Sequence, residues 1–330
     1  MSSNCATPEG TARYRARFSN RAFREQQGLV LSSIGIGTYL GNADEATDMN
    51  YTRAIVRAVQ LGVNVIDSAA NYRFQRSERS IGHALQTLAN EHGIARDELV
   101  ICTKGGYLPF DGAPPRNVRQ YVEDTFVNPG IASFADIVGG SHCMTPAYLQ
   151  SQLEQSLRNM KLECVDVYYI HNPESQLQFV SETEFYTRLK LAFERLEQNR
   201  KQGKLAYYGV ATWNGFRARP HHSLARMIEA ARDVGGETHG LRFIQLPFNL
   251  AMPEAVEVAN ETIDGEDMSV VEAAKRLGVT VVASASLLQG RIPPEDAIQF
   301  AGETSGITTA LIGMSRIEHV EENLATGLHG

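Results

Sequence analysis

The sequence predicts an α/β protein folded as a single closed (β/α)8 barrel, with long loops at the carboxyl ends of its strands. Eight short, β-branched apolar runs alternate with amphipathic stretches of helical length, and no long segment is left over for a second domain. A chain of 330 residues is a usual size for such a barrel. An open, doubly wound sheet is the main alternative.

The predicted strands are short apolar runs, several of them apolar throughout, as expected of parallel strands covered on both faces. They span residues 31–37, 63–67, 99–103, 165–170, 205–211, 243–246, 279–283 and 308–312.

The predicted helices carry apolar residues three and four positions apart. They span residues 50–61, 77–92, 147–162, 183–202, 223–231, 270–277 and 316–325. Pro146 suits a first helical turn. Gly62, Gly203 and Gly278 each stand where a left-handed cap would end a helix and lead into a strand.

Residues 1–30 are predicted to be a solvated N-terminal extension, ahead of a barrel domain of residues 31–330. The extension is rich in arginine, which a transit peptide would also be, but Glu9 and Glu25 argue against that interpretation. A secretory signal is not expected, because the segment has no apolar centre.

Composition argues against several classes of partner. A net charge of -7 does not favour nucleic acid, and no apolar run approaches the length of a membrane span. Cys5, Cys102, Cys143 and Cys164 are scattered and lack metal-ligand spacing. Cys102 and Cys164 are expected to be small core residues. This cysteine usage fits a reducing compartment, so we expect a cytoplasmic protein.

Two connections between predicted strands and helices are longer than the other connections in the chain. Residues 107–145 follow the third predicted strand, and residues 247–268 follow the sixth. Loops of this length are usually lids or binding loops. Both follow the carboxyl ends of strands, where barrel active sites are assembled.

Ionisable side chains stand at the ends of three successive predicted strands. Asp67, Lys104 and His171 occupy these positions, and Tyr72 follows Asp67 in the same loop. Alone, each has an ordinary explanation: a loop cap, a rim salt bridge, a buried imidazole and a packed phenol. Together they form a constellation at one end of the barrel.

The four groups could act as one general acid. A phenol has a pKa of about 10 in water, and an adjacent ammonium lowers it by stabilising the phenolate. A carboxylate would keep the lysine charged and oriented, and a neutral imidazole could orient a carbonyl oxygen. This predicts that Tyr72 protonates an oxygen as hydride arrives at its carbon.

The order Asp67-x4-Tyr72, Lys104, His171 resembles the aldo-keto reductase superfamily. The strings GVNVIDSAANYRFQRSERSIGHAL, IHNP, GKLAYYGVATW and ALIGMSRIEHVEENL strengthen the resemblance, which runs from about residue 31 to the end. It implies NADPH-dependent reduction of an aldehyde or ketone, usually without a metal. Tyr72 would be the proton donor, supported by Asp67, Lys104 and His171.

The resemblance also implies a site for NADP(H). It includes residues near the nicotinamide, on the seventh strand and its loop, and at the adenosine phosphate: Gly37, Thr38, Tyr39, Gln245, Ser284, Leu287, Gly313, Ser315, Arg316, His319, Glu322 and Asn323. Independently of the family, Ser315 and Arg316 open a helix after the last strand, where free N–H groups favour an anion. Arg316 could bind a 2′-phosphate, which favours NADPH over NADH.

Some positions depart from the family pattern. Ser284 stands where many members carry a tyrosine that stacks on the nicotinamide, and Ala211 and Thr212 replace a common Ser-Asn pair. His319 replaces a common Gln or Arg. These departures leave the four catalytic candidates unchanged.

The substrate pocket is expected to be aromatic. Tyr39, Tyr107, Phe110 and Trp213 would line it, which favours an apolar or aromatic carbonyl over a highly charged one. The substrate itself and the oligomeric state stay open.

Three other patterns in the sequence imitate functional motifs. GIGTYLG at residues 35–41 is a weak dinucleotide fingerprint, since no helix is expected immediately after it. Tyr186 and Lys190 imitate a catalytic pair but sit in a helical, apolar stretch. Neither His221 nor His222 neighbours a strand end with carboxylate partners for a metal. A cofactor-binding regulatory subunit with little or no turnover is the alternative function.

Overall fold

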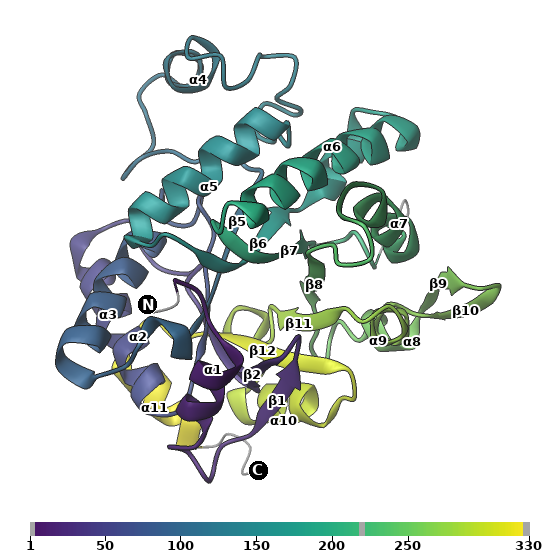
Figure 1. Cartoon of the computed structure of the whole chain (residues 1–330). Helices are drawn as coiled ribbons and strands as arrows, with labels where there is room; N and C mark the ends of the chain where they lie inside the picture. Colours follow the sequence, from purple (N-terminus) through teal and green to yellow (C-terminus); the bar gives the residue numbers. More distant parts are fainter. Residues whose placement is uncertain (1–3, 218–221, 326–330) are drawn as a thin grey trace.

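The computed structural model describes residues 4–217 and 222–325 and has a closed barrel of parallel strands at its centre (Figure 1). The strands follow the order β11-β12-β3-β4-β5-β6-β7-β8. They are β3 (Ile34–Gly37), β4 (Val65–Asp67), β5 (Val100–Gly105), β6 (Val165–His171), β7 (Leu205–Ala211), β8 (Leu241–Pro247), β11 (Thr280–Ser284) and β12 (Ile307–Gly313). All eight predicted strands are confirmed. The pairing of β12 with β3 closes the barrel and excludes the open sheet.

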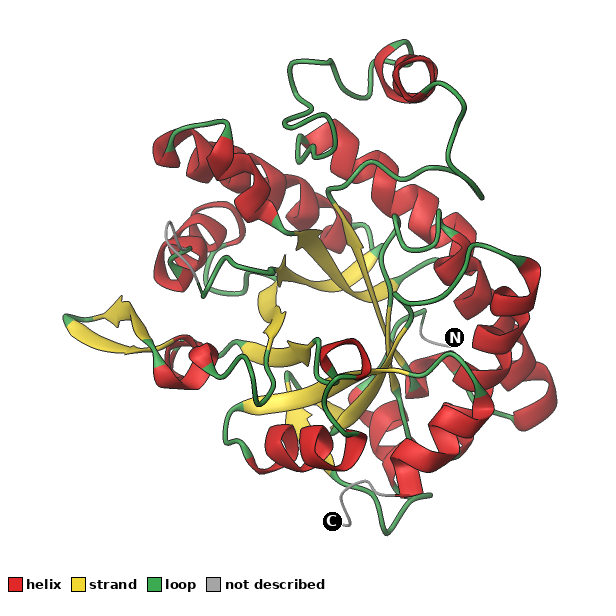
Figure 2. Ribbon diagram, turned by 180° about the vertical axis from the view of Figure 1, so that it is seen from behind, coloured by secondary structure: helices red, strands yellow, loops and turns green. Residues whose placement is uncertain are grey.

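Helices surround the barrel (Figure 2). They are α2 (Glu45–Gln60), α3 (Arg76–His92), α5 (Pro146–Met160), α6 (Glu182–Lys201), α7 (Leu224–Gly235), α9 (Val270–Arg276), α10 (Pro294–Glu303) and α11 (Ile317–Ala325). The sequence prediction omitted α10, although Pro294 followed by two acidic residues is a helix-start signal. The seven helices that the sequence predicted are confirmed to within a few residues, except that α2 begins five residues earlier than predicted.

The N-terminal segment is folded against the barrel, so the expectation that it is a solvated extension is corrected for the described residues. It forms α1 (Pro8–Arg15) and the hairpin of β1 (Phe23–Gln26) and β2 (Leu29–Ser32). The Tyr14 side chain of α1 is fully buried, and its hydroxyl donates to the carbonyl of Val63 at 3.0 Å. Leu29 and Leu31 of β2 close the end of the barrel interior opposite the strand carboxyl ends.

Cys5 and Cys164 form a disulfide that ties the start of the described chain to the strand β6 segment, with their Cα atoms 5.5 Å apart. Cys164 is buried, as expected, but it is disulfide-bonded and not a free core residue. Cys102 and Cys143 are buried free cysteines. Because disulfides are rare in a reducing cytosol, cysteine usage no longer supports the expected cytoplasmic location.

The two long connections lie in different places relative to the barrel. The β5–α5 connection contains α4 (Val118–Val122) and a π-helical turn (Glu123–Val127), and packs its own apolar cluster around Phe126 against α5. The connection after β8 contains α8 (Glu254–Glu257) and a hairpin of β9 (Ala259–Ile263) and β10 (Glu266–Ser269), which projects away from the barrel (Figure 1). The expectation that this second connection is an active-site loop is therefore corrected.

Within the described residues, none of the helices has the length and apolar character that a membrane crossing requires.

Candidate active site

Alternation along the strands brings the predicted catalytic residues into the barrel. Successive strand residues point to opposite faces, so every second side chain faces inward. The inward series run Val65, Asp67 on β4; Val100, Cys102, Lys104 on β5; Val167, Tyr169, His171 on β6; and Phe243, Gln245 on β8. Each series begins with residues of the inner apolar core and ends with a polar group at the carboxyl end of the strand. The barrel therefore collects four polar groups at one mouth.

A buried ion pair forms the floor of this site. Lys104 Nζ donates to Asp67 Oδ1 at 2.5 Å and to the Ser68 carbonyl at 2.6 Å. Gln245 Nε2 donates to the other carboxylate oxygen of Asp67 at 2.9 Å. Burial is the largest single effect on the pKa of Lys104 and lowers it, but the charge and hydrogen bond of Asp67 together with the electrostatic effect of Tyr72 outweigh burial, so the pKa is raised. The lysine is thus held as an ammonium.

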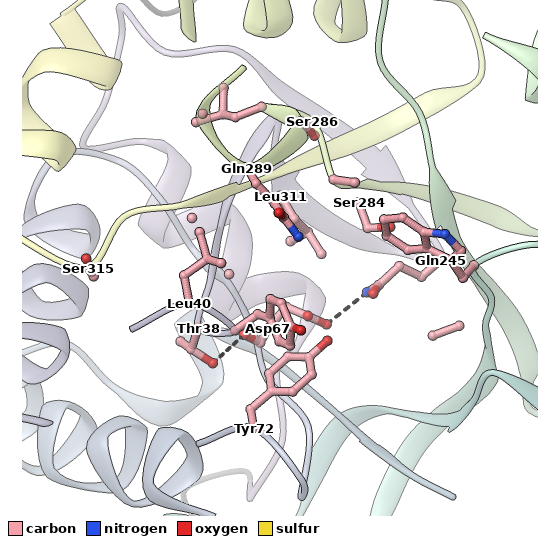
Figure 3. A pocket seen from close by; sticks show the side chains of 18 of the residues that line it. Thr38, Leu40, Asp67, Tyr72, Gln245, Ser284, Ser286, Gln289, Leu311 and Ser315 are labelled. Atoms are coloured by element: carbon pink, nitrogen blue, oxygen red, sulfur yellow. Dashed lines mark hydrogen bonds between the residues drawn. The ribbon is translucent and has the colours of Figure 1, made fainter. Parts of the chain in front are cut away.

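Tyr72 lies directly above this pair. Its ring centroid is 5.0 Å from Lys104 Nζ and 5.8 Å from the centroid of the His171 ring. Figure 3 shows Tyr72, Asp67 and Gln245 converging at the floor of the cavity. The predicted spatial grouping of the four residues is therefore present in the structure.

The pKa of Tyr72 differs in direction from the sequence expectation. Burial raises it, and the opposing effect of Lys104 does not overcome burial. The hydroxyl therefore keeps its proton at neutral pH, which a proton donor requires. The expectation of a net lowering is corrected, because an argument from the neighbouring charge alone omits the cost of burying a phenolate.

His171 is held as a neutral imidazole. Burial lowers its pKa well below the usual range, and the positive charge of Lys104 adds to this effect. Its Nδ1 is buried without a hydrogen-bond partner among the described residues. A neutral ring can donate from one nitrogen only, so it suits an oxygen acceptor at the mouth.

A cavity of about 780 Å³ opens above these residues. Most of the predicted cofactor and substrate residues line it: Gly37, Thr38, Tyr39, Tyr107, Trp213, Gln245, Ser284, Leu287, Gly313, Ser315, His319, Glu322 and Asn323. Asp67, Tyr72 and His171 line it as well. Lys104 lies behind the wall and reaches the site through Asp67 and Tyr72.

Phe110 does not line the cavity, and its expected substrate role is corrected. Its ring packs against Phe74, with centroids 6.2 Å apart, and edge-on against Tyr121 at 5.5 Å. The long connection turns back on itself after Tyr107 and carries Phe110 onto its own apolar cluster.

Arg316 also stands apart from the cavity lining. It is exposed, immediately precedes α11, and its Nη2 lies 2.8 Å from His319 Nε2. His319 does line the cavity. The guanidinium therefore stands beside the end of the cavity formed by Ser315 and His319.

A model of the aldo/keto reductase family matches residues 33–293, a range that holds all four catalytic candidates. The chain belongs to the aldo/keto reductase family.

Several curated proteins resemble this aldo/keto reductase. An L-glyceraldehyde 3-phosphate reductase of Escherichia coli (strain K12) is 26% identical over 231 residues, covering 69% of this chain and 52% of that protein. A D-threo-aldose 1-dehydrogenase of a Pseudomonas species is 25% identical over 187 residues, covering 56% and 51%. A Schizosaccharomyces pombe protein, provisionally named a voltage-gated potassium channel subunit beta, is 26% identical over 204 residues, covering 62% and 48%. The chain spans about half the length of these curated relatives.

Solved aldo/keto reductases share the fold. The holo form of a Bacillus halodurans aldo-keto reductase superposes with a TM-score of 0.62 at 17% identity, covering 93% of this chain and 90% of that one. A Klebsiella pneumoniae aldo/keto reductase in complex with NADP and acetate gives a TM-score of 0.56 at 18% identity, covering 93% and 89%.

Sequence reasoning missed part of the cavity wall of this aldo/keto reductase. Thr212 appeared only as a departure from the family pattern, and Ser286 not at all. Both line the cavity, and both hydroxyl oxygens are buried without a hydrogen-bond partner among the described residues. Other missed lining residues are Leu40, Tyr51, Asn71, Asn172, Gln289 and Leu311. Ala285, in the cavity wall after β11, has a φ of 52°. This conformation is rare for alanine, and no sequence pattern predicted it.

The other sequence patterns have structural explanations. The Tyr186 hydroxyl accepts from the Ser223 amide at 3.0 Å, and Lys190 pairs with Asp233 on α7. His222 is buried and stacks on Phe185, whereas His221 lies outside the described residues. No cluster of three or more potential metal ligands occurs in the described ranges.

Proposed function

We propose that this chain is an NADPH-dependent carbonyl reductase that converts an aldehyde or ketone to an alcohol. When bound, the reduced nicotinamide supplies the hydride. The observation that carries the proposal is Tyr72, which keeps its proton beside the buried Lys104–Asp67 pair at the floor of the cavity.

The cavity suits a long, polar cofactor. Its volume of about 780 Å³ lies in the range of cofactor and ligand sites. Buried polar groups normally have hydrogen-bond partners, so the unpartnered Thr212 and Ser286 hydroxyls in its wall suit polar atoms of a bound molecule. The NADP in the Klebsiella pneumoniae relative supports the same class of cofactor. We assign Gly37, Thr38, Tyr39, Gln245, Ser284, Leu287, Gly313, Ser315, Arg316, His319, Glu322 and Asn323 to this site.

The chain's own residues would manage the proton. Tyr72 holds it on its hydroxyl oxygen and donates it to the carbonyl oxygen of the substrate. Lys104 then stabilises the phenolate left behind, and Asp67 keeps Lys104 charged and in place. Neutral His171 orients the carbonyl oxygen by donating a hydrogen bond.

Coenzyme preference depends on the start of α11. Ser315 lines the cavity and Arg316 lies beside it, where unpaired N–H groups and a guanidinium favour a phosphate. We therefore propose NADPH over NADH. Fluorescence titration with both coenzymes tests this: Arg316→Ala should weaken NADPH binding and leave NADH binding unchanged, and equal affinities in the wild type would contradict it.

The substrate end of the cavity has aromatic walls. Tyr39, Tyr107 and Trp213 line it around Tyr72 and His171, which favours an apolar or aromatic carbonyl. Higher kcat/KM for small polyhydroxylated aldehydes would contradict this assignment.

Tyr72→Phe tests the reaction directly. The variant keeps the ring but has no proton to give, so kcat with a panel of aldehydes and NADPH should fall by about 10²- to 10⁴-fold. The Kd for NADPH should stay close to that of the wild type. Undiminished turnover in the variant would remove Tyr72 from the mechanism.

A regulatory subunit is the alternative, favoured by the name of the Schizosaccharomyces pombe relative. It predicts that wild type and Tyr72→Phe both bind NADPH and that neither turns over any aldehyde of the panel. Turnover by the wild type alone supports the reductase.

A further inference from the structure

A left-handed turn follows Tyr72 directly. Arg73, Phe74 and Gln75 have φ values of 48°, 58° and 69°. Three consecutive residues with side chains in this conformation are unfavourable, because each brings its Cβ too close to the backbone. The turn therefore persists through its contacts with other segments, and those contacts also determine where Tyr72 sits.

Arg73 makes the most extensive of these contacts. Its side chain is only 2% exposed, although it carries a full charge. Nε donates to the Asn42 carbonyl at 2.8 Å, and Nη2 forms an ion pair with Asp48 of α2. The guanidinium carbon also lies 5.2 Å from the centroid of the Tyr51 ring. One arginine thus joins the turn to α2 and to the loop between β3 and α2.

That loop, residues 38–44, forms a wall of the proposed nicotinamide end. Thr38, Tyr39 and Leu40 line the cavity, as does Tyr51 from α2. The Tyr51 hydroxyl donates to the Leu40 carbonyl at 2.7 Å, and the Tyr39 and Tyr72 rings lie 5.0 Å apart. The contacts of Arg73 therefore help to determine where Tyr72 lies relative to this wall.

The other two residues of the turn contact the long connection. Phe74 stacks on Phe110, and the Gly112 amide donates to the Phe74 carbonyl at 2.9 Å. Gln75 Nε2 donates to the Phe110 carbonyl at 3.1 Å. The turn thus joins two loops that belong to different strands.

We propose that Arg73 is a positioning residue, which holds the Tyr72 hydroxyl and the 38–44 wall in the geometry that hydride and proton transfer require. The inference rests on the proposed reductase function. A purely structural Arg73 would contribute to folding stability without affecting coenzyme affinity or the chemical step in molecules that have folded.

Three variants separate these two roles. Arg73→Met keeps the chain length and removes the charge, whereas Arg73→Lys keeps the charge but cannot reproduce the planar fork that reaches both loop and helix. Arg226→Met is the matched control. Arg226 also makes an ion pair, with Glu182, and lies over an aromatic ring, Tyr186, but it contacts neither the cavity nor the turn.

Hydrogen–deuterium exchange of the coenzyme-free protein gives the first measurement. Amides of residues 38–44 and 71–75 should exchange faster in Arg73→Met than in the wild type, and at the wild-type rate in Arg226→Met. NADPH titration and saturating kinetics give the second. A misplacement of about 1 Å can cost on the order of 10²-fold in rate, so kcat for Arg73→Met should fall by about that factor, with a raised Kd for NADPH. Arg73→Lys should lie between Arg73→Met and the wild type.

Unchanged exchange, NADPH affinity and kcat in folded Arg73→Met, with only a lower Tm, would overturn the proposal. If Arg73→Met does not fold, Arg73→Lys provides the comparison, and Asp48→Asn, which also removes the Asp48–Arg76 ion pair, tests the other side of the contact. Failure of the reductase function is recognised separately: the wild type would then turn over no aldehyde, while exchange and NADPH affinity would still report on Arg73.

Discussion

The Lys104–Asp67 pair shows how a buried charge can serve chemistry. Both side chains are almost fully buried, and each charged group has more than one hydrogen-bond partner. Removing one member of such a pair typically lowers the free energy of unfolding by about 3–5 kcal/mol, because the other charge is left unpaired in an interior of low dielectric constant. The ion pair therefore holds Lys104 in its charged form next to Tyr72, against the effect of burial on its pKa.

Asp67→Asn should change the pH dependence of the reaction. Reduction needs a protonated Tyr72, so the alkaline limb of the kcat–pH profile reports its pKa. Asp67 raises that pKa and Lys104 lowers it. Without the carboxylate, the pKa of buried Lys104 falls, so the ammonium that stabilises the phenolate is lost at lower pH. The alkaline limb should therefore move to lower pH, together with a lower kcat. A limb that stays in place or moves to higher pH would contradict this assignment of Tyr72.

At the scale of elements, the loop after β7 is held by one carboxylate. Glu174 lies in the short helical segment after β6 (Pro173–Gln178), and its Oε1 accepts from the Trp213 amide at 2.7 Å and the Asn214 amide at 2.9 Å. Trp213 lines the cavity and is the single tryptophan of the chain. Its fluorescence therefore reports on this wall alone.

Glu174→Ala should loosen the Trp213 wall without changing the proton donor. Hydrogen bonds to a charged group are worth about 1.5–3 kcal/mol each, and both would be lost. We expect the tryptophan emission to shift to longer wavelength and KM for the carbonyl to rise about tenfold, with little change in kcat. Glu174→Gln keeps an acceptor oxygen and serves as the control. A fall in kcat at constant KM would show instead that the loop acts on the chemical step.

At the scale of the whole molecule, buried neutral histidines make stability depend on pH. His142, His171 and His239 are all buried, and burial lowers the pKa of each. For His239 the pKa falls to about 4. Unfolding returns these groups to a pKa near 6.5. The unfolded chain therefore binds more protons between these values, and stability is lost as pH falls below about 6.5.

His239→Gln should remove part of this dependence. Between pH 7.5 and pH 5.0, the His239 shift to about 4 corresponds to about 2 kcal/mol of lost unfolding free energy. Denaturant unfolding at both pH values checks this, and the variant should lose correspondingly less than the wild type. Equal losses in the two proteins would contradict a neutral, buried His239. The residue lies outside the cavity lining, so the variant should keep its NADPH affinity.

Local sequence patterns predicted much of the architecture. They did not predict features that depend on contacts between residues far apart in the chain. The barrel strands were recognisable because each is an apolar run bounded by turn residues. The β9–β10 hairpin was missed although Asp264-Gly265, with φ values of 53° and 83°, is a recognised two-residue hairpin turn. The position of Phe110 had no local signal, since its ring packs against Phe74, which follows β4, and against Tyr121, further along the same connection.

The sequence by itself determined that Asp67, Lys104 and His171 would meet, because strand alternation and a common strand end leave their side chains few other places to point. Only the tertiary structure decided the protonation of Tyr72, the pairing of Cys5 with Cys164, and the left-handed turn at Arg73. Each of these depends on burial or on a contact between residues far apart in the chain. Local composition records neither quantity.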